Sequence, residues 1–265
     1  MQTTHITASA GTSHTTDVGS RVLGIGVMAI GVVGLAIGDF LPGQPVPAGL
    51  PGRAVLAYVA GAFLLLGGAA LVWRKTALRG AAALTAYYTI VVMILLNGRV
   101  LIAHYAEFLA YEGAAIQLAI TVGLLIVYAA RADIDAALAA RLVRFGQLTF
   151  GVCALIFGAA HFVYTNLTAP LVPTWLPPGQ QFWAYATGGC LIAAGVAILT
   201  GVQARLAAIL LTAMFASFGV LVHARMLLAD PSNHWIWNEN AVNLAVMGAS
   251  WVLADSLSTR AAPAR

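Results

Sequence analysis

The chain of 265 residues is 61% hydrophobic and only 8% charged, and its mean hydropathy is +0.89. A soluble globular protein of this length needs more polar surface, so the composition excludes that class and predicts an integral membrane protein. The net charge of +4 comes from basic residues scattered near the predicted helix ends. This distribution is typical of membrane flanks, and we do not expect nucleic-acid binding.

Eight apolar runs recur along the sequence, and each is long enough to cross a hydrocarbon core of about 30 Å. In chain order, the predicted helices run from about residue 21 to 37, from 54 to 73, up to 103, up to 130, from 145 onward, from 182 to 201, up to 229 and up to 254. The expected fold class is therefore an all-α membrane protein with eight transmembrane helices.

The helices are expected to fall into two four-helix halves, residues 19–130 and 145–255. A hydrophilic linker, RADIDAALAARLVR at 131–144, separates them. Residues 1–18 are rich in Thr and Ser and read as a disordered tail, and residues 256–265 read as a second tail. The two cysteines lie inside apolar runs and form no CxxC motif.

The two halves resemble each other in sequence. LLNGRVLIAH at 95–104 matches LVHARMLLAD at 221–230, and PVPAGLP at 45–51 matches LVPTWLP at 171–177, both at a spacing of 126 residues. The first match pairs Asn97 with His223, Arg99 with Arg225 and His104 with Asp230. Because each half holds an even number of spans, we predict a tandem duplication with a pseudo-two-fold axis along the membrane normal.

Basic residues predict the orientation. Ten of the 13 Lys and Arg residues flank the termini and the turns on the same side as the termini: Arg21, Arg74, Lys75, Arg79, Arg131, Arg141, Arg144, Arg205, Arg260 and Arg265. Basic flanks mark the cytoplasmic side, so both termini and the 131–144 linker are expected to be cytoplasmic. The histidines outside the N-terminal tail then lie in or beside the extracytoplasmic half of the membrane.

Arg99 and Arg225 are candidate ligand-binding residues, together with the neighbouring Asn97 and His104. A matched arginine pair facing a central cleft could neutralise an anionic ligand or a quinone oxygen. Alternatively, each arginine extends its side chain to the interface without any role in binding.

A second candidate cluster combines His223, Asp230, Glu239 and Asn243. His223 and Asp230 share a helical stripe if the helix reaches that far, and Glu239 and Asn243 are spaced i, i+4 on the next helix. Ionisable groups within spans are candidates for catalysis or proton transfer. Hydrogen bonding between helices would explain the same pattern without a function.

His161 is the ionisable group in the apolar part of its span, and its role is either a hydrogen bond to a neighbouring helix or contact with a quinone, a proton or a metal. His161 and His223 could together ligate haem or copper. We rank that hypothesis lower, because the sequence contains neither CxxCH nor HxxxH. Trp175 and His234 belong to the same face, as interfacial anchors or as lining of a route for an amphipathic ligand.

Segments of the second half resemble the DoxX-like family of small bacterial membrane proteins: GAAHFVY at 158–164, PLVPTWLPPGQQFWAYATGGCLIAAGVAIL at 170–199 and ARLAAILLTAMF at 204–215. The resemblance covers about residues 145–253 and implies a fusion of two four-helix units in a bacterial inner membrane. The family is named for a membrane subunit associated with a thiosulfate:quinone oxidoreductase, and most members have no assigned activity. It supplies no catalytic residues to carry over.

Together these observations suggest a quinone-interacting subunit of a redox complex. The candidate catalytic residues are His161, His223, Asp230 and Glu239. A soluble redox subunit would be its partner, membrane lipid would surround it, and a homo-oligomer is compatible with the sequence. The alternatives are a binding or transport module for a lipid or small hydrophobic molecule, and a haem or copper protein.

Overall fold

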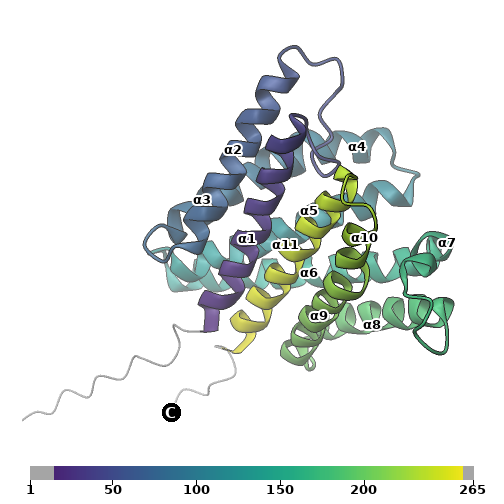
Figure 1. Ribbon diagram of the computed structural model, residues 1–265. Coiled ribbons are helices and arrows are strands. Elements are labelled where there is room, and N and C mark those ends of the chain that lie inside the picture. The colour runs from purple at the N-terminus through teal and green to yellow at the C-terminus, as the bar shows by residue number, and fades with distance from the viewer. Residues whose placement is uncertain (1–14, 259–265) are drawn as a thin grey trace, which may run out of the picture.

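The computed structural model describes residues 15–258, and the regular secondary structure in this range is helical throughout (Figure 1). The elements are α1 (Thr15–Ile37), α2 (Arg53–Val72), α3 (Ala77–Tyr87), η1 (Tyr88–Asn97), α4 (Gly98–Ala103), α5 (Phe108–Arg131), α6 (Ala136–Val163), α7 (Thr165–Thr168), η2 (Ala169–Leu171), α8 (Gln180–Thr200), α9 (Ala204–Phe218), η3 (Gly219–His223), α10 (Ala224–Ala229) and α11 (His234–Ser258). Within this range, eight spans are long and apolar enough to cross a membrane, which indicates a multi-pass membrane protein.

Two helices extend further than the sequence predicts. α1 begins at Thr15 and α11 ends at Ser258, so residues 15–18 and 256–258 are helical and do not belong to tails. Extending an existing helix adds a hydrogen bond for each residue without a new nucleation step. Residues 1–14 and 259–265 of the predicted tails lie outside the described residues.

The connection between the halves is shorter than the predicted linker at 131–144. α5 continues to Arg131 and α6 already begins at Ala136, which leaves four residues between them. The Asp135 side chain caps α6 by accepting a hydrogen bond from the Leu138 backbone N–H at 3.0 Å. The Ala- and Leu-rich segment that follows has high helix propensity, so its charges lie on a helix and not in a loop.

Within each half, the first two long helices approach each other through glycines. A Cβ added at Gly31 of α1 would lie 2.7 Å from the Gly61 carbonyl oxygen of α2. A Cβ added at Gly158 of α6 would lie 2.7 Å from the Gly188 carbonyl oxygen of α8. Such small-residue contacts let the backbones of membrane helices pack directly. Four glycines of α1 and α2 recur 127 residues later on α6 and α8, as the pairs Gly24/Gly151, Gly31/Gly158, Gly61/Gly188 and Gly68/Gly195.

The first and fourth spans of each half form the contact between the halves. α1 packs against α11, α5 packs against α6, and α5 and α11 pack against each other. Here too the contact is close, because Gly248 of α11 lies directly against the backbone of Leu23 in α1. The buried core runs through this interface and includes Leu23, Ile120 and Ala245.

The third and seventh spans each contain a π-helical segment followed by a short α-helix. η1 ends at Asn97 and η3 ends at His223, and the six-residue helices α4 and α10 follow them. π segments inside longer helices are often found at functional sites. These two lie near one end of the bundle, formed by loops 38–52, 104–107, 164–179 and 230–233, which we call the distal end. The start of α1 and the end of α11 lie together at the opposite end (Figure 1).

Candidate functional site

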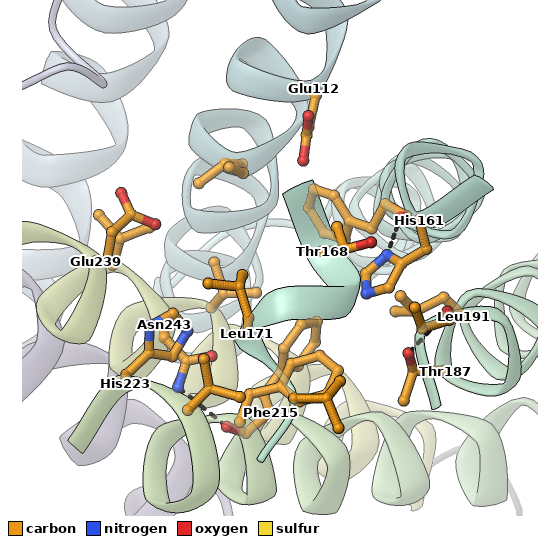
Figure 2. A pocket seen from close by; sticks show the side chains of 18 residues that line it. Glu112, His161, Thr168, Leu171, Thr187, Leu191, Phe215, His223, Glu239 and Asn243 are labelled. Atoms are coloured by element: carbon orange, nitrogen blue, oxygen red, sulfur yellow. Dashed lines mark hydrogen bonds between the residues drawn. The ribbon is translucent and has the colours of Figure 1, made fainter. Parts of the chain in front are cut away.

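A cavity of about 240 Å³ lies at the distal end of the second half, which we call the second-half cavity (Figure 2). α6, α8, α9, η3 and α11 surround it, together with loop 164–179, and α5 of the first half contributes Glu112 and Ile116. Its wall is mostly apolar and includes the rings of Phe157, Phe215 and Phe218. Four residues predicted from the sequence line it, namely His161, His223, Glu239 and Asn243.

His161 has a defined tautomer in its neutral form. Its Nδ1 lies 2.8 Å from the Phe157 carbonyl oxygen, and because a carbonyl only accepts, Nδ1 carries the proton. Its ring also stacks on Phe218, with the ring centroids 6.3 Å apart. Figure 2 shows the second ring nitrogen turned toward the cavity. A neutral His161 therefore presents a hydrogen-bond acceptor to whatever occupies the cavity.

Other polar side chains of the wall also use their donors on the backbone. The Thr187 hydroxyl donates to the Trp183 carbonyl at 2.6 Å, and the Thr168 hydroxyl donates to the Tyr164 carbonyl at 3.2 Å. The Asn243 side chain donates one of its two N–H groups to the Phe215 carbonyl at 3.0 Å (Figure 2). A hydroxyl has only one hydrogen, so each threonine keeps only acceptor capacity.

His223 lies at the end of η3, where the backbone changes from π to α geometry. Its carbonyl oxygen accepts a hydrogen bond from the Asn240 side chain at 3.0 Å, which fixes η3 against α11. Its Nδ1 atom is buried and has no hydrogen-bond partner in the described residues. In the first half the corresponding residue, Asn97, donates to the Val92 and Gly43 carbonyls at 2.8 and 3.2 Å.

A larger cavity of about 490 Å³ adjoins the first at the contact between the halves, and we call it the inter-half cavity. Glu112, Ile116, Glu239 and Val242 line both cavities, so the two carboxyl groups lie where the cavities meet. The Asn238 side chain donates to Glu239 Oε1 at 3.3 Å. In the described part of the chain, no lysine or arginine lines either cavity. The lining is therefore acidic and rich in acceptors.

Two further predicted residues, Asn97 and His104, line the inter-half cavity. His104 lies at its exposed rim, where its Nδ1 is 2.8 Å from the Glu107 carboxylate. Trp235 lines this cavity as well, whereas Trp175 is exposed in loop 164–179 and His234 is exposed at the start of α11.

The remaining predicted residues do not reach either cavity. Asp230 follows the last residue of α10 and is exposed, so it does not continue the helical stripe of His223. The Ser232 hydroxyl donates to Asp230 at 2.7 Å and lowers the pKa of that carboxyl below its usual 3.8. Arg99 and Arg225 are both exposed, and Arg99 donates to the Pro45 carbonyl at 2.8 Å. The expected pairing of these arginines across a central cleft is not present.

Sequence reasoning missed three polar residues of the second-half cavity, namely Glu112, Thr168 and Thr187. Glu112 was expected in a polar loop, but α5 begins at Phe108 and places it within a span. An acid a few residues before a long apolar run is the signal that could have identified it. Threonines are common in apolar spans, so Thr187 carried no such signal.

No group of three or more His, Cys, Asp and Glu side chains within residues 15–258 is arranged to hold a metal ion. His161 and His223 both line the second-half cavity, but these residues supply no third ligand of that kind beside them.

A comparison with protein families gives a match in the second half. Residues 150–254, which contain most of the second-half cavity, match a family described as a domain of unknown function (DUF8561). No curated protein and no solved structure matches the chain.

Proposed function

We propose that the second-half cavity binds the head group of a quinol and that the protein is the quinol-interacting membrane subunit of a redox complex. The observation that carries the proposal is the acceptor-rich wall. His161, Thr168 and Thr187 have each used their donor on a backbone carbonyl, and Glu112 and Glu239 add carboxyl oxygens. A quinol head is an apolar ring with two O–H donors, which suits an apolar cavity that offers acceptors.

The same wall favours the reduced form of the ligand. An oxidised quinone has only carbonyl acceptors and would leave the acceptors of the wall unpaired, at a cost of about 1–3 kcal/mol for each group. Without a lysine or arginine in the lining, an anionic ligand would also meet two carboxyl groups. We therefore assign Arg225 no role in stabilising an anionic quinone.

In the proposed reaction, the two O–H bonds of the quinol break and both electrons leave the ring. The protons pass to acceptors of the wall, with His161 and Glu239 as the candidates, and the electrons pass to a soluble redox protein docked at the distal end. The residues described offer no redox group of their own, so this partner is part of the proposal.

We further propose that the chain is a tandem duplication in a bacterial inner membrane, with both termini cytoplasmic and the second-half cavity on the extracytoplasmic side. Support comes from the glycine pairs 127 residues apart, from η1 and η3 ending at residues 126 apart, and from the basic residues near the end that holds the termini. The resemblance to the DoxX-like family agrees with this arrangement.

Calorimetric titration of the purified full-length chain with a short-chain ubiquinol and with the matching ubiquinone, under anaerobic conditions, tests the proposal. We expect the quinol to bind roughly tenfold more tightly, which corresponds to one or two net hydrogen bonds. His161→Phe keeps an aromatic ring against Phe218 but removes the acceptor, so the preference should disappear. His234→Phe, on an exposed residue outside both cavities, is the matched control. Equal affinity of the wild type for both forms would contradict the proposal.

A second candidate function is the binding or transport of a lipid or another hydrophobic molecule. It is favoured by the apolar walls and by the continuity of the two cavities through Ile116 and Val242. In that case the affinity depends on buried apolar area, and His161→Phe leaves it unchanged. A Soret absorbance band in the purified protein would instead point to haem.

A further inference from the structure

The loop of the first half is fixed from two sides. From the α2 side, Arg53 donates to the Val46 and Pro47 carbonyls and forms an ion pair with Asp39 at 2.8 Å. From the side of η1 and α4, Asn97 donates to the Gly43 carbonyl and Arg99 to the Pro45 carbonyl. Leu41 and Gln44 of this loop are buried beside a space of only about 10 Å³. On its other side, Pro42, Gly43 and Pro45 of the loop line the inter-half cavity.

The corresponding loop of the second half, residues 164–179, is held by α8, α6 and α5 but lacks the attachment from the end of the third span. Trp183 of α8 donates to the Pro177 carbonyl at 2.9 Å, Thr165 donates to the His161 carbonyl, and Tyr164 packs against Phe108 of α5. At the start of α8, Gln180 donates to the Val172 carbonyl at 2.6 Å, much as Arg53 donates to Val46. Within residues 15–258, no hydrogen bond or ion pair joins η3 or α10 to this loop. Arg225 is exposed and, among residues 15–258, has no hydrogen-bond or ion-pair partner, and His223 Nδ1 is likewise unpaired. Leu171 and His223 line the same cavity from different elements.

The sequence spacing identifies the missing partners. The motif that matches PVPAGLP with LVPTWLP places Leu171 where Pro45 stands, 126 residues earlier. The same spacing relates Arg225 to Arg99 and His223 to Asn97. A donor therefore stands on α10, and a carbonyl stands on the loop, at the positions that are joined in the first half.

We propose that loop 164–179 is a lid over the ligand of the second-half cavity and that Arg225 is the positioning residue that latches it, by donating to the Leu171 carbonyl. This inference rests on the proposed ligand site. Gly179, with φ of 150°, provides a hinge that other residues rarely allow, and the prolines at 170, 173, 177 and 178 stiffen the loop so that it moves as a unit. Closure excludes water from the bound head group.

A cross-linking experiment tests the lid without requiring knowledge of the ligand. In a Cys153→Ala, Cys190→Ala background of the full chain, Leu171→Cys is combined with Arg225→Cys and the protein is mildly oxidised. A disulfide needs Cα atoms within about 7 Å, which a closing loop provides. We expect the cross-link to form with and without short-chain ubiquinol, because Arg225→Cys removes the side chain through which the ligand would favour closure. The control pair, Leu171→Cys with Val220→Cys on an exposed position outside the cavity lining, should not react.

Failure of the cross-link both with and without ubiquinol overturns the lid, whether or not ubiquinol binds. Cross-linking without any ubiquinol binding leaves the lid standing and rejects the proposed ligand. The two inferences thus fail separately.

Hydrogen exchange of loop 164–179 tests the latch. In the wild type, ubiquinol should slow exchange of this loop, whereas Arg225→Ala should abolish the ligand-dependent slowing and weaken binding roughly tenfold. Arg225→Lys, which retains a donor, should restore part of both effects. A merely structural role of Arg225 would change exchange in the ligand-free protein, and that result would reject the latch.

Discussion

Leu41 in the distal loop of the first half is 6% exposed, whereas Leu171 in the distal loop of the second half is 38% exposed and lines the second-half cavity. Both loops border a cavity, because Gly43 and Pro45 of the first-half loop line the inter-half cavity. The helices that support these two loops pack through glycines at matching positions. The halves therefore share a scaffold and differ in how the loop meets the end of the third span of each half. The donors at the end of the third span therefore decide whether that span holds the neighbouring loop.

Different side-chain hydrogen bonds at the end of the third span of each half account for the difference between the two loops. Asn97 and Arg99 each donate to the loop of the first half, whereas neither His223 nor Arg225 donates to the loop of the second. Unpaired polar groups at a helix end suit a site that must bind something else.

The largest expected effect tests the shared scaffold. Gly31→Val and Gly158→Val each place a side chain against a neighbouring backbone, and each should destabilise the protein by about 3 kcal/mol. Thermal unfolding in detergent would measure both. Gly189→Ala, where an added Cβ meets no atom within 4 Å, should be neutral or slightly stabilising. Tolerance of one valine but not of the other would show that the halves do not pack alike.

The next largest effect compares the stability contributions of Asn97 at the end of η1 and His223 at the end of η3. Asn97→Leu leaves the Val92 and Gly43 carbonyls without their donor and should cost about 2 kcal/mol of unfolding free energy. His223→Leu removes a side chain whose buried Nδ1 has no partner, so it should be near neutral or stabilising. Urea or thermal denaturation of both variants gives the comparison. Equal destabilisation would mean that His223 is held as firmly as Asn97.

The sequence was sufficient to predict the eight spans, but not the residue at which α6 begins or the π-helical segments. Spans were predicted from the length of apolar runs, which is fixed by the thickness of the membrane core. The start of α6 at Ala136 was missed because hydrophilic composition suggested a linker, although Asp135 and the alanines favour a helix. The π segments depend on contacts with distant elements, such as that of Asn240 with the His223 carbonyl, and have no local signature.

The candidate site was predicted in part for a similar reason. His161, His223, Glu239 and Asn243 were identified because polar groups within apolar spans are rare, and all four line the second-half cavity. Asp230 was misplaced because its position depended on the residue at which α10 ends. Arg99 and Arg225 extend to the surface, since a long basic side chain can leave the apolar region at little cost.

A smaller effect distinguishes the two arginines in the ligand-free protein. Arg99→Ala removes the hydrogen bond to the Pro45 carbonyl and should lower stability by about 1 kcal/mol. Arg225→Ala removes no hydrogen bond or ion pair within residues 15–258 and should change stability by less than about 0.5 kcal/mol. Thermal unfolding without ligand measures both. A larger loss for Arg225→Ala would show that its side chain already holds the second-half loop.

The smallest effect concerns acid dependence. The hydrogen bond from Arg53 lowers the pKa of Asp39 below 3.8, so this carboxylate stabilises the folded first-half loop above that value and loses the contribution as pH falls through the lowered pKa. Because both side chains are partly exposed to solvent, we expect less than about 1 kcal/mol. Hydrogen exchange, corrected for the intrinsic effect of pH, should show loop 38–52 loosening only as the pH falls below 3.8. Asp39→Asn should show the loosened state already at neutral pH. Loop 164–179 should not loosen in acid, because the uncharged Gln180 occupies the position that corresponds to Arg53. If both loops loosened alike as the pH falls, the Asp39–Arg53 ion pair would not be the cause.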